Sequence, residues 1–324
     1  MAESRNPEQA GPVLELVDLH KTFRTGLTLK EVQAVRGVNL QVKPGEIFGY
    51  LGPNGAGKTT TMKMAMGLIA PTQGHIKIFG RPVTDRSVRQ HIGYLPEHPF
   101  FYDYLTGAEL VGYYGRLFGL SRRECKKRAD ELLDLVGLAH AKNRRLRGYS
   151  KGMLQRTGIA QAMVNDPDFL VLDEPLGGLD PIGRREVRDI VLSLRDQGKT
   201  IFFSSHILHD IETICDRVAI IHHGLVERVG KLDALLGGQT PASDVTAYRP
   251  GSEADEVKLI ATLEATGATC TKGEMLNIRV EQGKLQEVLS ACVELGARVT
   301  HVAPRRETLE DLFMREAGGS REAV

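Results

Sequence analysis

The stretch GPNGAGKTT (52–60) decides the fold of this chain. It fits the pattern G-x-x-x-x-G-K-[ST] in every fixed position, and it lies between the strand-like EIFGYL (46–51) and the helix-like KTTTMKMAMGL (58–68). Such glycines leave backbone N–H groups free to surround phosphate, the lysine reaches the β- and γ-phosphates, and the following hydroxyl can ligate Mg²⁺. The alternative is a glycine-rich turn that contains a lysine by chance, and the strand before the motif and the helix after it disfavour that alternative. We predict a nucleotide-binding loop with Lys58 in catalysis and Thr59 on the metal; its residues are Gly52, Pro53, Asn54, Gly55, Ala56, Gly57, Lys58, Thr59 and Thr60.

A short apolar run that ends in two acids, DFLVLDEP (168–175), supplies the complement to this loop. It is typical of a buried parallel strand. Asp173 can reach a metal ion directly or through water, and Glu174 can take a proton from an attacking water. The alternative is an acidic turn after a core strand. The two motifs fit many phosphate-loop NTPases, but the sequence has no NKxD guanine-reading motif and no clear lid of a small-molecule kinase.

Composition indicates a globular chain without a general affinity for polyanions. Its 324 residues are enough for about two domains, and 41% hydrophobic with 26% charged residues are ordinary values. A formal net charge of +1 excludes a general attraction to nucleic acid or anionic lipid. Four distant cysteines without CxxC spacing indicate reduced thiols in a cytosolic protein. No run approaches the roughly 18 apolar residues of a membrane span.

Strand-like and helix-like segments alternate in a main domain at residues 13–236, which predicts an α/β fold with a largely parallel sheet. Near its start, VLELVDL (13–19) and VQAVRGVNLQV (32–42) alternate like half-exposed antiparallel strands. The polar residues 1–12 are expected to form a disordered tail.

A helical subdomain is expected at about residues 98–165. Two capping boxes, Thr106 with Glu109 and Ser121 with Glu124, open two of its helices. In a capping box the side chain of each residue bonds the backbone N–H of the other, so the motif fixes where a helix begins.

A composition change at GGQTPASD (237–244) predicts a linker after the main domain. Beyond it, the periodicity gives the order strand, helix, two strands, helix, strand. That βαββαβ order predicts a small ferredoxin-like α+β domain at residues 245–324, and this domain carries no catalytic constellation.

A second anion-binding pattern occurs in RGYSKGMLQR (147–156). Ser150 is a good helix N-cap, and Gly152 lets backbone come close to a ligand. A helix start with free N–H groups and a positive dipole end favours phosphate. The chain already has a phosphate loop upstream. If each chain binds one nucleotide, this second anion-binding site has no ligand within its own chain.

Six motifs in order resemble the nucleotide-binding subunits of ABC transporters. They are GPNGAGKTT, GYLPE (93–97), YSKGMLQR (149–156), FLVLDEP, GGLD (177–180) and FFSSH (202–206). The shorter motifs are weak singly, but their order and spacing over about residues 13–230 argue against chance. The resemblance implies a RecA-like core with an antiparallel β subdomain and a helical subdomain, and ATP with Mg²⁺ as the bound groups.

The resemblance also gives the second anion site its ligand. In that family the segment at YSKGM binds the γ-phosphate of an ATP held by the opposite subunit, and two subunits pack head to tail around two ATPs. It implies a second nucleotide-binding subunit; a homodimer is favoured and a heterodimer stays open. The implied contacts are Phe23 on adenine, Glu97 near Mg²⁺, His206 on the γ-phosphate and attacking water, Ser150, Lys151 and Gly152 on the partner's ATP, and Asp180 in the loop that crosses between subunits.

Two of these residues have plainer alternatives. Phe23 can be a core aromatic, and His206 can be a structural histidine; the order of the motifs favours the functional interpretation. Two others depart from the common family pattern, because Lys151 stands where glycine is usual and Glu97 where glutamine is usual. We hypothesise that Lys151 offsets the Glu97 charge across the dimer, since opposite charges about 6 Å apart interact by roughly 2–3 kcal/mol at an effective dielectric near 20.

Four aromatic residues gather in PEHPFFYDYLTG (96–107), in a chain with only 10 Phe, 8 Tyr and no Trp. They are Phe100, Phe101, Tyr102 and Tyr104. Aromatic residues gather at protein interfaces, and in the family this segment forms the groove for a cytoplasmic helix of the membrane subunit. The alternative is that the rings fill the core of the helical subdomain.

The resemblance thus implies the ATP-hydrolysing subunit of an ABC transporter of the exporter-like branch, which works with a separate ABC-2-like permease. It would be cytoplasmic and peripheral on the inner face of the cell membrane, with no nucleic-acid partner. Lys58, Thr59 and Asp173 would position Mg²⁺–ATP, Glu174 would be the base and His206 the switch. One alternative is a soluble ABC ATPase that acts on nucleic acid or ribosomes, which usually has tandem cassettes, coiled-coil insertions or basic faces. A regulatory module that no longer hydrolyses ATP conflicts with Glu174 and His206.

Overall fold

The computed structural model describes residues 11–25, 30–236 and 242–305. Most of the expected tail and residues 306–324 of the expected C-terminal domain lie outside this part. The chain divides into two compact units, Met1–Leu232 and Asp233–Val324. None of the helices in the described ranges has the length and apolar character that crossing a membrane requires.

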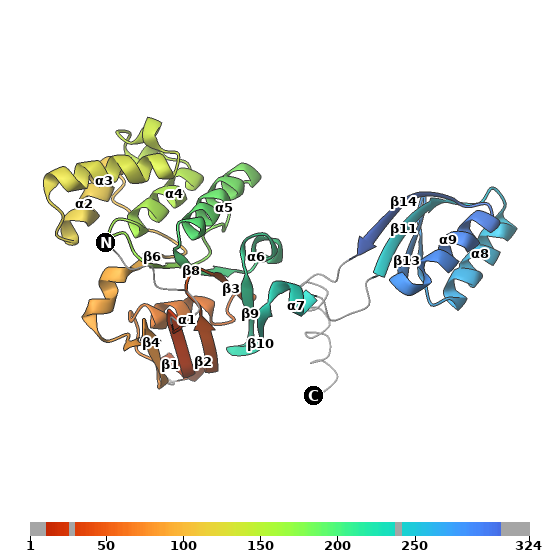
Figure 1. Cartoon of the computed structure of the whole chain (residues 1–324), viewed down its shortest axis with the longest axis horizontal. Coiled ribbons are helices and arrows are strands. Elements are labelled where there is room, and N and C mark those ends of the chain that lie inside the picture. The colour runs from red at the N-terminus through yellow and green to blue at the C-terminus, as the bar shows by residue number, and fades with distance from the viewer. Residues whose placement is uncertain (1–10, 26–29, 237–241, 306–324) are drawn as a thin grey trace. The chain divides into compact units, whose positions relative to one another are not determined.

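A six-stranded sheet forms the centre of the first unit, in the order β10-β9-β3-β8-β7-β6 (Figure 1). All neighbouring strands are parallel except β9 and β10, as the alternation of elements predicts. Strands β3, β7 and β8 are buried at every residue, because both faces of the sheet are covered. The bounds are β3 Ile47–Leu51, β6 Ile92–Leu95, β7 Phe169–Leu172, β8 Thr200–Ser205, β9 Arg217–His222 and β10 Leu225–Lys231.

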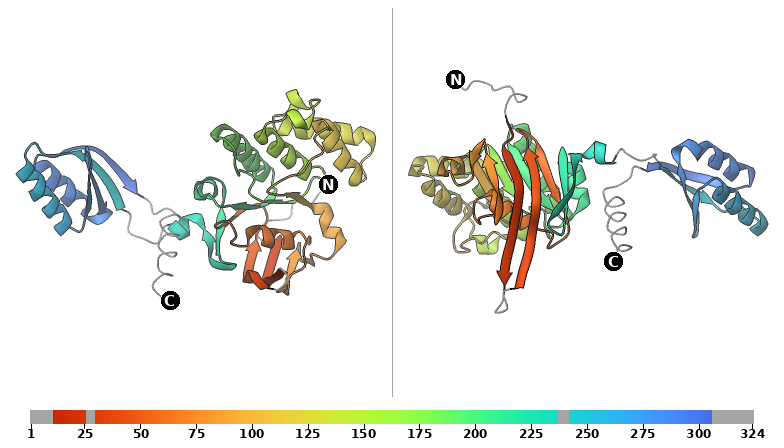
Figure 2. Two further views of the ribbon diagram at one scale, coloured as in Figure 1. Left: turned by 180° about the vertical axis from the view of Figure 1, so that it is seen from behind. Right: turned by 90° about the horizontal axis from the view of Figure 1, so that it is seen from below.

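A smaller antiparallel sheet has the order β2-β1-β4-β5. Strands β1 and β2 run side by side over their whole length (Figure 2), with Leu14 opposite Val42. Helix α1, Lys58–Ala65, lies between the two sheets in Figure 1. Its Met62 and Met64 are buried in one cluster with residues of both sheets, so the same core holds the phosphate loop in place. The bounds are β1 Leu14–Thr25, β2 Lys30–Val42, β4 Gln73–Ile78 and β5 Arg81–Pro82.

Helices α2, α3 and α4 form the expected helical subdomain, and both capping boxes are present. The Thr106 hydroxyl accepts the Glu109 N–H at 3.2 Å, and the Glu109 carboxylate accepts the Thr106 N–H at 2.8 Å. Ser121 and Glu124 repeat this arrangement at the start of α3. The helices of the first unit and the segment after it are α2 Gly107–Leu117, α3 Arg122–Leu135, α4 Lys151–Ala162, α5 Pro181–Asp196, α6 Leu208–Ile214 and α7 Leu232–Leu236, with short 3₁₀ turns η2 Arg86–His91, η3 Ala139–Ala141 and η4 Leu146–Gly148.

The second unit has the βαββαβ order that the periodicity predicts. Its antiparallel sheet has the order β12-β13-β11-β14, and the helices α8 and α9 bury Leu259, Leu263 and Val288 against it. Strand β11 begins at Ala242, inside the range 237–244 that the composition assigns to a linker, because these residues pair with the end of β13. The bounds are β11 Ala242–Tyr248, α8 Glu253–Ala265, β12 Thr269–Lys272, β13 Leu276–Glu281, η5 Gln282–Lys284, α9 Leu285–Glu294 and β14 Arg298–Arg305.

Candidate active site

The glycine-rich loop connects the end of β3 to the start of α1. Two of its glycines are required by close backbone neighbours: a Cβ at Gly52 would lie 2.2 Å from the Ile221 oxygen, and one at Gly57 would lie 2.4 Å from the Ala34 oxygen. Gly57 also has a φ of 107°, which favours glycine. It caps α1 without a side chain, and the first turn of α1 contains no acid. The free N–H groups of this helix start can therefore bind a phosphate.

The Lys58 side chain is buried and is held by three oxygen atoms. Its Nζ donates to the carbonyl oxygens of Gly52 at 2.6 Å and of Pro53 at 3.2 Å. It also lies 3.1 Å from Glu174 Oε1, in an ion pair whose side chains are only 5% and 8% exposed. Because water screens such a pair weakly, the attraction between the two charges is strong. A phosphate that enters the loop must compete with Glu174 for this ammonium group.

Asp173 and Glu174 follow β7, and one hydroxyl on the neighbouring strand β8 contacts both. Ser204 Oγ donates to Asp173 Oδ1 at 2.7 Å and accepts the Glu174 backbone N–H at 2.8 Å. Glu174 has a φ of 48°, a left-handed conformation that costs an L-residue roughly 1–2 kcal/mol. Burial raises the pKa of Asp173, and the nearby Glu97 and Glu174 carboxylates raise it further, whereas the Ser204 and Thr59 hydroxyls lower it.

His206 follows β8 and contacts the second carboxylate oxygen of Glu174. Its Nδ1 lies 2.8 Å from Glu174 Oε2, and its side chain is 39% exposed. Lys58, Glu174 and His206 therefore form a continuous chain from the buried loop to the surface. Strand β8 lies between β3 and β7 in the sheet, so the segments after these three strands meet at one edge.

A cleft of about 240 Å³ opens beside Lys58. Glu97, which follows β6, also lines this cleft beside the phosphate loop. The Glu97 side chain is about half exposed, and its Oε1 lies 3.8 Å from His98 Nδ1. The residues that line the cleft are Ala34, Asn54, Gly55, Gly57, Lys58, Thr59, Thr60, Glu97 and Glu174.

The oxygen atoms at the edge of this cleft suit Mg²⁺. Asp173 Oδ2 is buried and has no hydrogen-bond partner among the described residues, and the Thr59 hydroxyl is close enough to affect the Asp173 pKa. The described ranges contain no group of three or more His, Cys, Asp or Glu side chains that could hold a metal alone. This fits Mg²⁺, which usually binds one or two carboxylates and takes further oxygens from substrate phosphates and water.

Several residues with expected nucleotide contacts do not line this cleft: Gly52, Pro53 and Ala56 of the loop, His206, and the more distant Phe23, Ser150, Lys151, Gly152 and Asp180. Phe23 is 36% exposed on β1, with Lys21 Nζ 5.1 Å from its ring centre. Ser150 caps α4 by accepting the Met153 N–H at 3.3 Å. Asp180 caps α5 by accepting the Gly183 N–H at 2.9 Å.

The start of α4 lies against the segment GGLD (177–180). A Cβ at Gly178, whose φ is 65°, would lie 2.1 Å from Lys151 Nζ. A Cβ at Gly152 would lie 4.0 Å from Gly183 Cα. The two segments that are expected to contact a partner's nucleotide thus share one region of this chain's surface.

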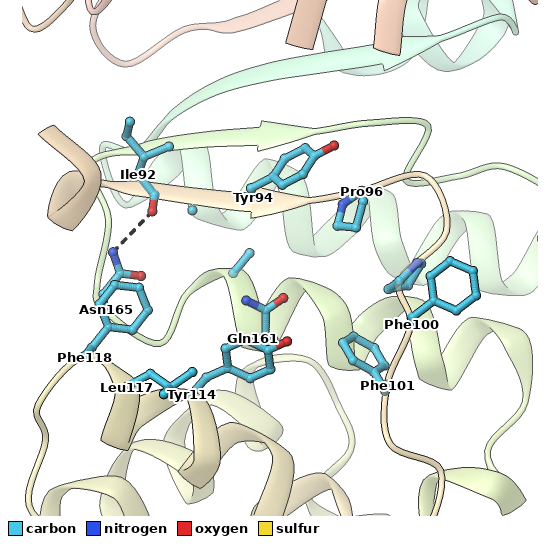
Figure 3. A pocket seen from close by; sticks show the side chains of 13 residues that line it. Ile92, Tyr94, Pro96, Phe100, Phe101, Tyr114, Leu117, Phe118, Gln161 and Asn165 are labelled. Carbon is cyan, nitrogen blue, oxygen red and sulfur yellow. Dashed lines mark hydrogen bonds between the residues drawn. The ribbon is translucent and has the colours of Figure 1, made fainter. Parts of the chain in front are cut away.

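A groove of about 450 Å³ lies between β6, the segment 96–101, α2 and α4 (Figure 3). Figure 3 shows Tyr114, Leu117 and Phe118 on one side, and Phe100 with Phe101 on the segment that closes one end. Phe100 is 93% exposed, whereas Phe101 is partly buried and faces Gly158 of α4. The other two expected aromatics, Tyr102 and Tyr104, do not line the groove and lie with ring centres 5.7 Å apart. Of the four aromatic residues that are close in sequence, two therefore line the groove and two pack against each other outside it.

Ser204 and Ala34 belong to the site, but residue patterns assign neither of them a role, although Ser204 lies within FFSSH (202–206). A signal for Ser204 is present, because two hydroxyls end the otherwise apolar run TIFFSS (200–205) and buried polar groups need partners. Ala34 contributes its backbone oxygen near Gly57 and part of the cleft wall. No residue-type pattern could indicate a contact made by a backbone atom.

A parallel sheet with a glycine-rich loop after one strand, paired acids after a second and a histidine after the strand between them defines a phosphate-loop NTPase. The antiparallel sheet and the helical subdomain extend this core in the manner of an ATP-binding cassette.

Known proteins place the chain in a family. Residues 35–177 match a family model described as ABC transporter. The chain is 43% identical over 318 residues to an uncharacterised ABC transporter ATP-binding protein of Synechocystis sp., covering 97% of this chain and 87% of that protein. It is 37% identical over 317 residues to the bacitracin transport ATP-binding protein BcrA of Bacillus licheniformis, covering 95% and 98%. A solved dimeric ATP-binding cassette bound to ADP and Pi has a TM-score of 0.62 and 28% identity, covering 68% of this chain and 98% of that chain. The chain belongs to the ABC transporter family, as an ATP-binding subunit.

Proposed function

We propose that this chain hydrolyses ATP as part of a dimer and that hydrolysis drives export through a separate ABC-2-like permease. The observation that supports hydrolysis most strongly is the buried Glu174 carboxylate, which lies between the Lys58 ammonium at 3.1 Å and the His206 imidazole at 2.8 Å. An acidic turn with no catalytic task would leave its carboxylate in water, because burial of a charge is costly. Here the carboxylate lines the cleft that the phosphate loop opens.

Each residue of the site has one task in this proposal. Lys58 and the N–H groups at the start of α1 hold the phosphates. Thr59, Asp173 and Glu97 would hold Mg²⁺, which would neutralise phosphate charge. Glu174 takes a proton from the water that attacks the γ-phosphorus, while the bond to the ADP oxygen breaks and inorganic phosphate leaves. His206 orients the Glu174 carboxylate and the attacking water.

A second subunit completes the site. Ser150, Lys151, Gly152 and Asp180 would contact the nucleotide of that subunit, and two observations support this. They do not line their own chain's cleft, and the starts of α4 and α5 lie together on one surface. The solved relative bound to ADP and Pi is itself dimeric. Phe23, with its partly exposed ring, would stack on adenine, and we favour a homodimer over a heterodimer.

The groove in Figure 3 would receive the permease, which holds this chain at the inner face of the cell membrane. An apolar groove with the nearly free Phe100 ring at its end has the aromatic character of interface centres. A role in transport is supported by the likeness to a protein named for bacitracin transport.

The test of hydrolysis compares the purified full-length chain with Glu174→Gln. The wild type is expected to release phosphate from Mg²⁺–ATP, and the variant to be slower by about a hundredfold or more, because a positioned base contributes 10²–10⁴. Glu131→Gln, a matched change on the exposed surface of α3, should leave the rate unchanged. Equal and negligible rates of phosphate release by the wild type and Glu174→Gln would refute the proposal that this chain hydrolyses ATP.

A further inference from the structure

We propose that Ser204 is a positioning residue, whose hydroxyl fixes the metal-binding carboxylate of Asp173 and the backbone of the base Glu174 together. This inference rests on the proposed ATP hydrolysis and adds one residue to its machinery. Ser204 is fully buried near the end of β8, the strand that lies between β3 of the phosphate loop and β7 of the acids.

The Ser204 hydroxyl accepts one hydrogen bond and donates another, so the two bonds run consecutively from Glu174 to Asp173. The Glu174 N–H donates to Ser204 Oγ at 2.8 Å, and Ser204 Oγ–H donates to Asp173 Oδ1 at 2.7 Å. Consecutive hydrogen bonds of this kind strengthen one another at low dielectric. Only a group that both donates and accepts can stand at this position, which for a small side chain means serine or threonine.

The first consequence concerns Asp173. Because Oδ1 is bonded to Ser204, the carboxylate cannot rotate freely, and its buried Oδ2 stays without a partner among the described residues. That oxygen is left for a cation beside Thr59.

The second consequence concerns Glu174. Successive residues of a strand point to opposite faces, so an extended chain would send Asp173 and Glu174 apart. The left-handed backbone at Glu174, φ 48°, changes this direction. Ser204 holds the N–H of that residue, and the side chain then reaches both Lys58 and His206.

The test separates positioning from simple packing by a pair of isosteric variants. Ser204→Thr keeps the hydroxyl, Ser204→Val has the same shape without it, and Ser204→Ala removes it without added volume. Ser193→Ala is the control, because it also removes a serine hydroxyl that makes an internal hydrogen bond, here to Ile190 O at 2.8 Å on α5, outside the cleft.

Two quantities are measured on the full-length chain: the affinity for ATP with excess chelator and with increasing Mg²⁺, and the Mg²⁺ concentration for half-maximal phosphate release. We expect Ser204→Ala and Ser204→Val to need about tenfold more Mg²⁺, the effect of losing a partner of a metal ligand. Their affinity for metal-free ATP should be unchanged, and Ser204→Thr and Ser193→Ala should behave like wild type.

The proposal is overturned if Ser204→Val needs no more Mg²⁺ than Ser204→Thr, or if Ser204→Ala loses metal-free and Mg²⁺-dependent ATP binding equally. Where alanine and valine prevent folding, Ser204→Cys decides, since a thiol keeps the volume but is a weak donor and acceptor; an unchanged Mg²⁺ requirement would then refute the role. If the wild type binds Mg²⁺–ATP but does not hydrolyse it, the proposed ATPase activity is refuted instead. The binding measurements would still decide the role of Ser204.

Discussion

The Lys58 ammonium and the Glu174 carboxylate form a nearly buried ion pair, with Nζ 3.1 Å from Oε1. One residue comes from the start of α1 and the other from the end of β7, so the pair joins the two sequence motifs of the site. The residue that we propose as phosphate ligand is thus held by the residue that we propose as base. In the proposed function, binding of ATP and release of the base would be one event, because phosphate oxygens would replace the carboxylate at Lys58.

Replacement of Glu174 by glutamine is therefore expected to tighten ATP binding. The amide no longer competes for Lys58, and the fraction of molecules with an available ammonium rises. We expect about a tenfold lower Kd, which is roughly 1.4 kcal/mol, in a titration with a fluorescent ATP analogue. Glu46→Gln is the control, because Glu46 is also nearly buried and pairs with Arg217 at 2.9 Å away from the cleft lining. Equal affinity in wild type and Glu174→Gln would show that the pair does not compete with nucleotide.

Loss of Lys58 alone should destabilise the nucleotide-free chain. Lys58→Met leaves the Glu174 carboxylate buried without its ammonium, and removal of one partner of a buried pair costs about 3–5 kcal/mol. The double variant Lys58→Met/Glu174→Gln should recover part of that loss, because no unpaired charge stays buried. Denaturant unfolding followed by circular dichroism measures the free energy of unfolding of the wild type, the two single variants and the double variant. Additive effects of the two substitutions would argue against coupling.

Asp173→Asn should stabilise the chain at neutral pH when Mg²⁺ is removed by a chelator. Burial, the largest effect, raises the pKa of Asp173 in the folded protein, so the ionised form disfavours folding above that raised pKa and has no such effect at acidic pH. The variant should melt about 2–4 °C higher at pH 8, the shift that roughly 1 kcal/mol produces in a unit of this size. The gain should shrink as the pH falls toward the ordinary range of aspartate.

Mg²⁺–ATP provides the control for this prediction. It should raise the melting temperature of the wild type more than that of Asp173→Asn, because the amide is a poorer ligand for a hard cation. An Asn variant that is less stable than wild type at pH 8 in chelator would contradict the assignment of a buried, ionised carboxylate with one oxygen free for a metal.

Phe100→Ala should weaken attachment to the membrane partner without an effect on the fold. The ring is 93% exposed, so its removal should change stability by less than about 0.5 kcal/mol, whereas loss of an interface anchor costs more than roughly 1 kcal/mol. The measurement is the fraction of the chain that sediments with membranes of the source cells. Leu68→Ala, which removes another exposed apolar side chain outside the groove lining, is the matched control. Equal sedimentation of both variants would exclude Phe100 from the interface.

Lys151 and Glu97 should act together on the ATPase rate of the dimer. If Lys151 of one subunit offsets the Glu97 charge of the other, Lys151→Gly will slow a chain with Glu97 more than a chain with Glu97→Gln. Charges about 6 Å apart at an effective dielectric near 20 give a coupling of up to roughly 2–3 kcal/mol, less where solvent screens them. Additive effects on the rate would show instead that Lys151 acts within its own chain, where its Nζ lies beside Gly178.

Several features of the fold could be predicted because they depend on short stretches of chain. The capping boxes at Thr106 and Ser121, the phosphate loop between β3 and α1, and the βαββαβ order of the second unit follow from residue spacing. The start of β11 at Ala242 could not be predicted in this way. Its first residues are ordered by pairing with the distant β13, which local composition does not contain.

The chemical groups proposed for the site could be predicted before the structure: the phosphate-binding loop and the two acids after β7 from their residue types, and Glu97 and the histidine after β8 from the family resemblance. The tertiary structure alone decided how these groups are joined, with Glu174 between Lys58 and His206, and Ser204 between the two acids. The physical reason is that a motif fixes residue types along one segment, whereas burial and hydrogen-bond direction depend on which strands become neighbours. Because β8 lies between β3 and β7, Ser204, to which the motif FFSSH assigns no role, bonds one oxygen of Asp173 and leaves the other free for a metal.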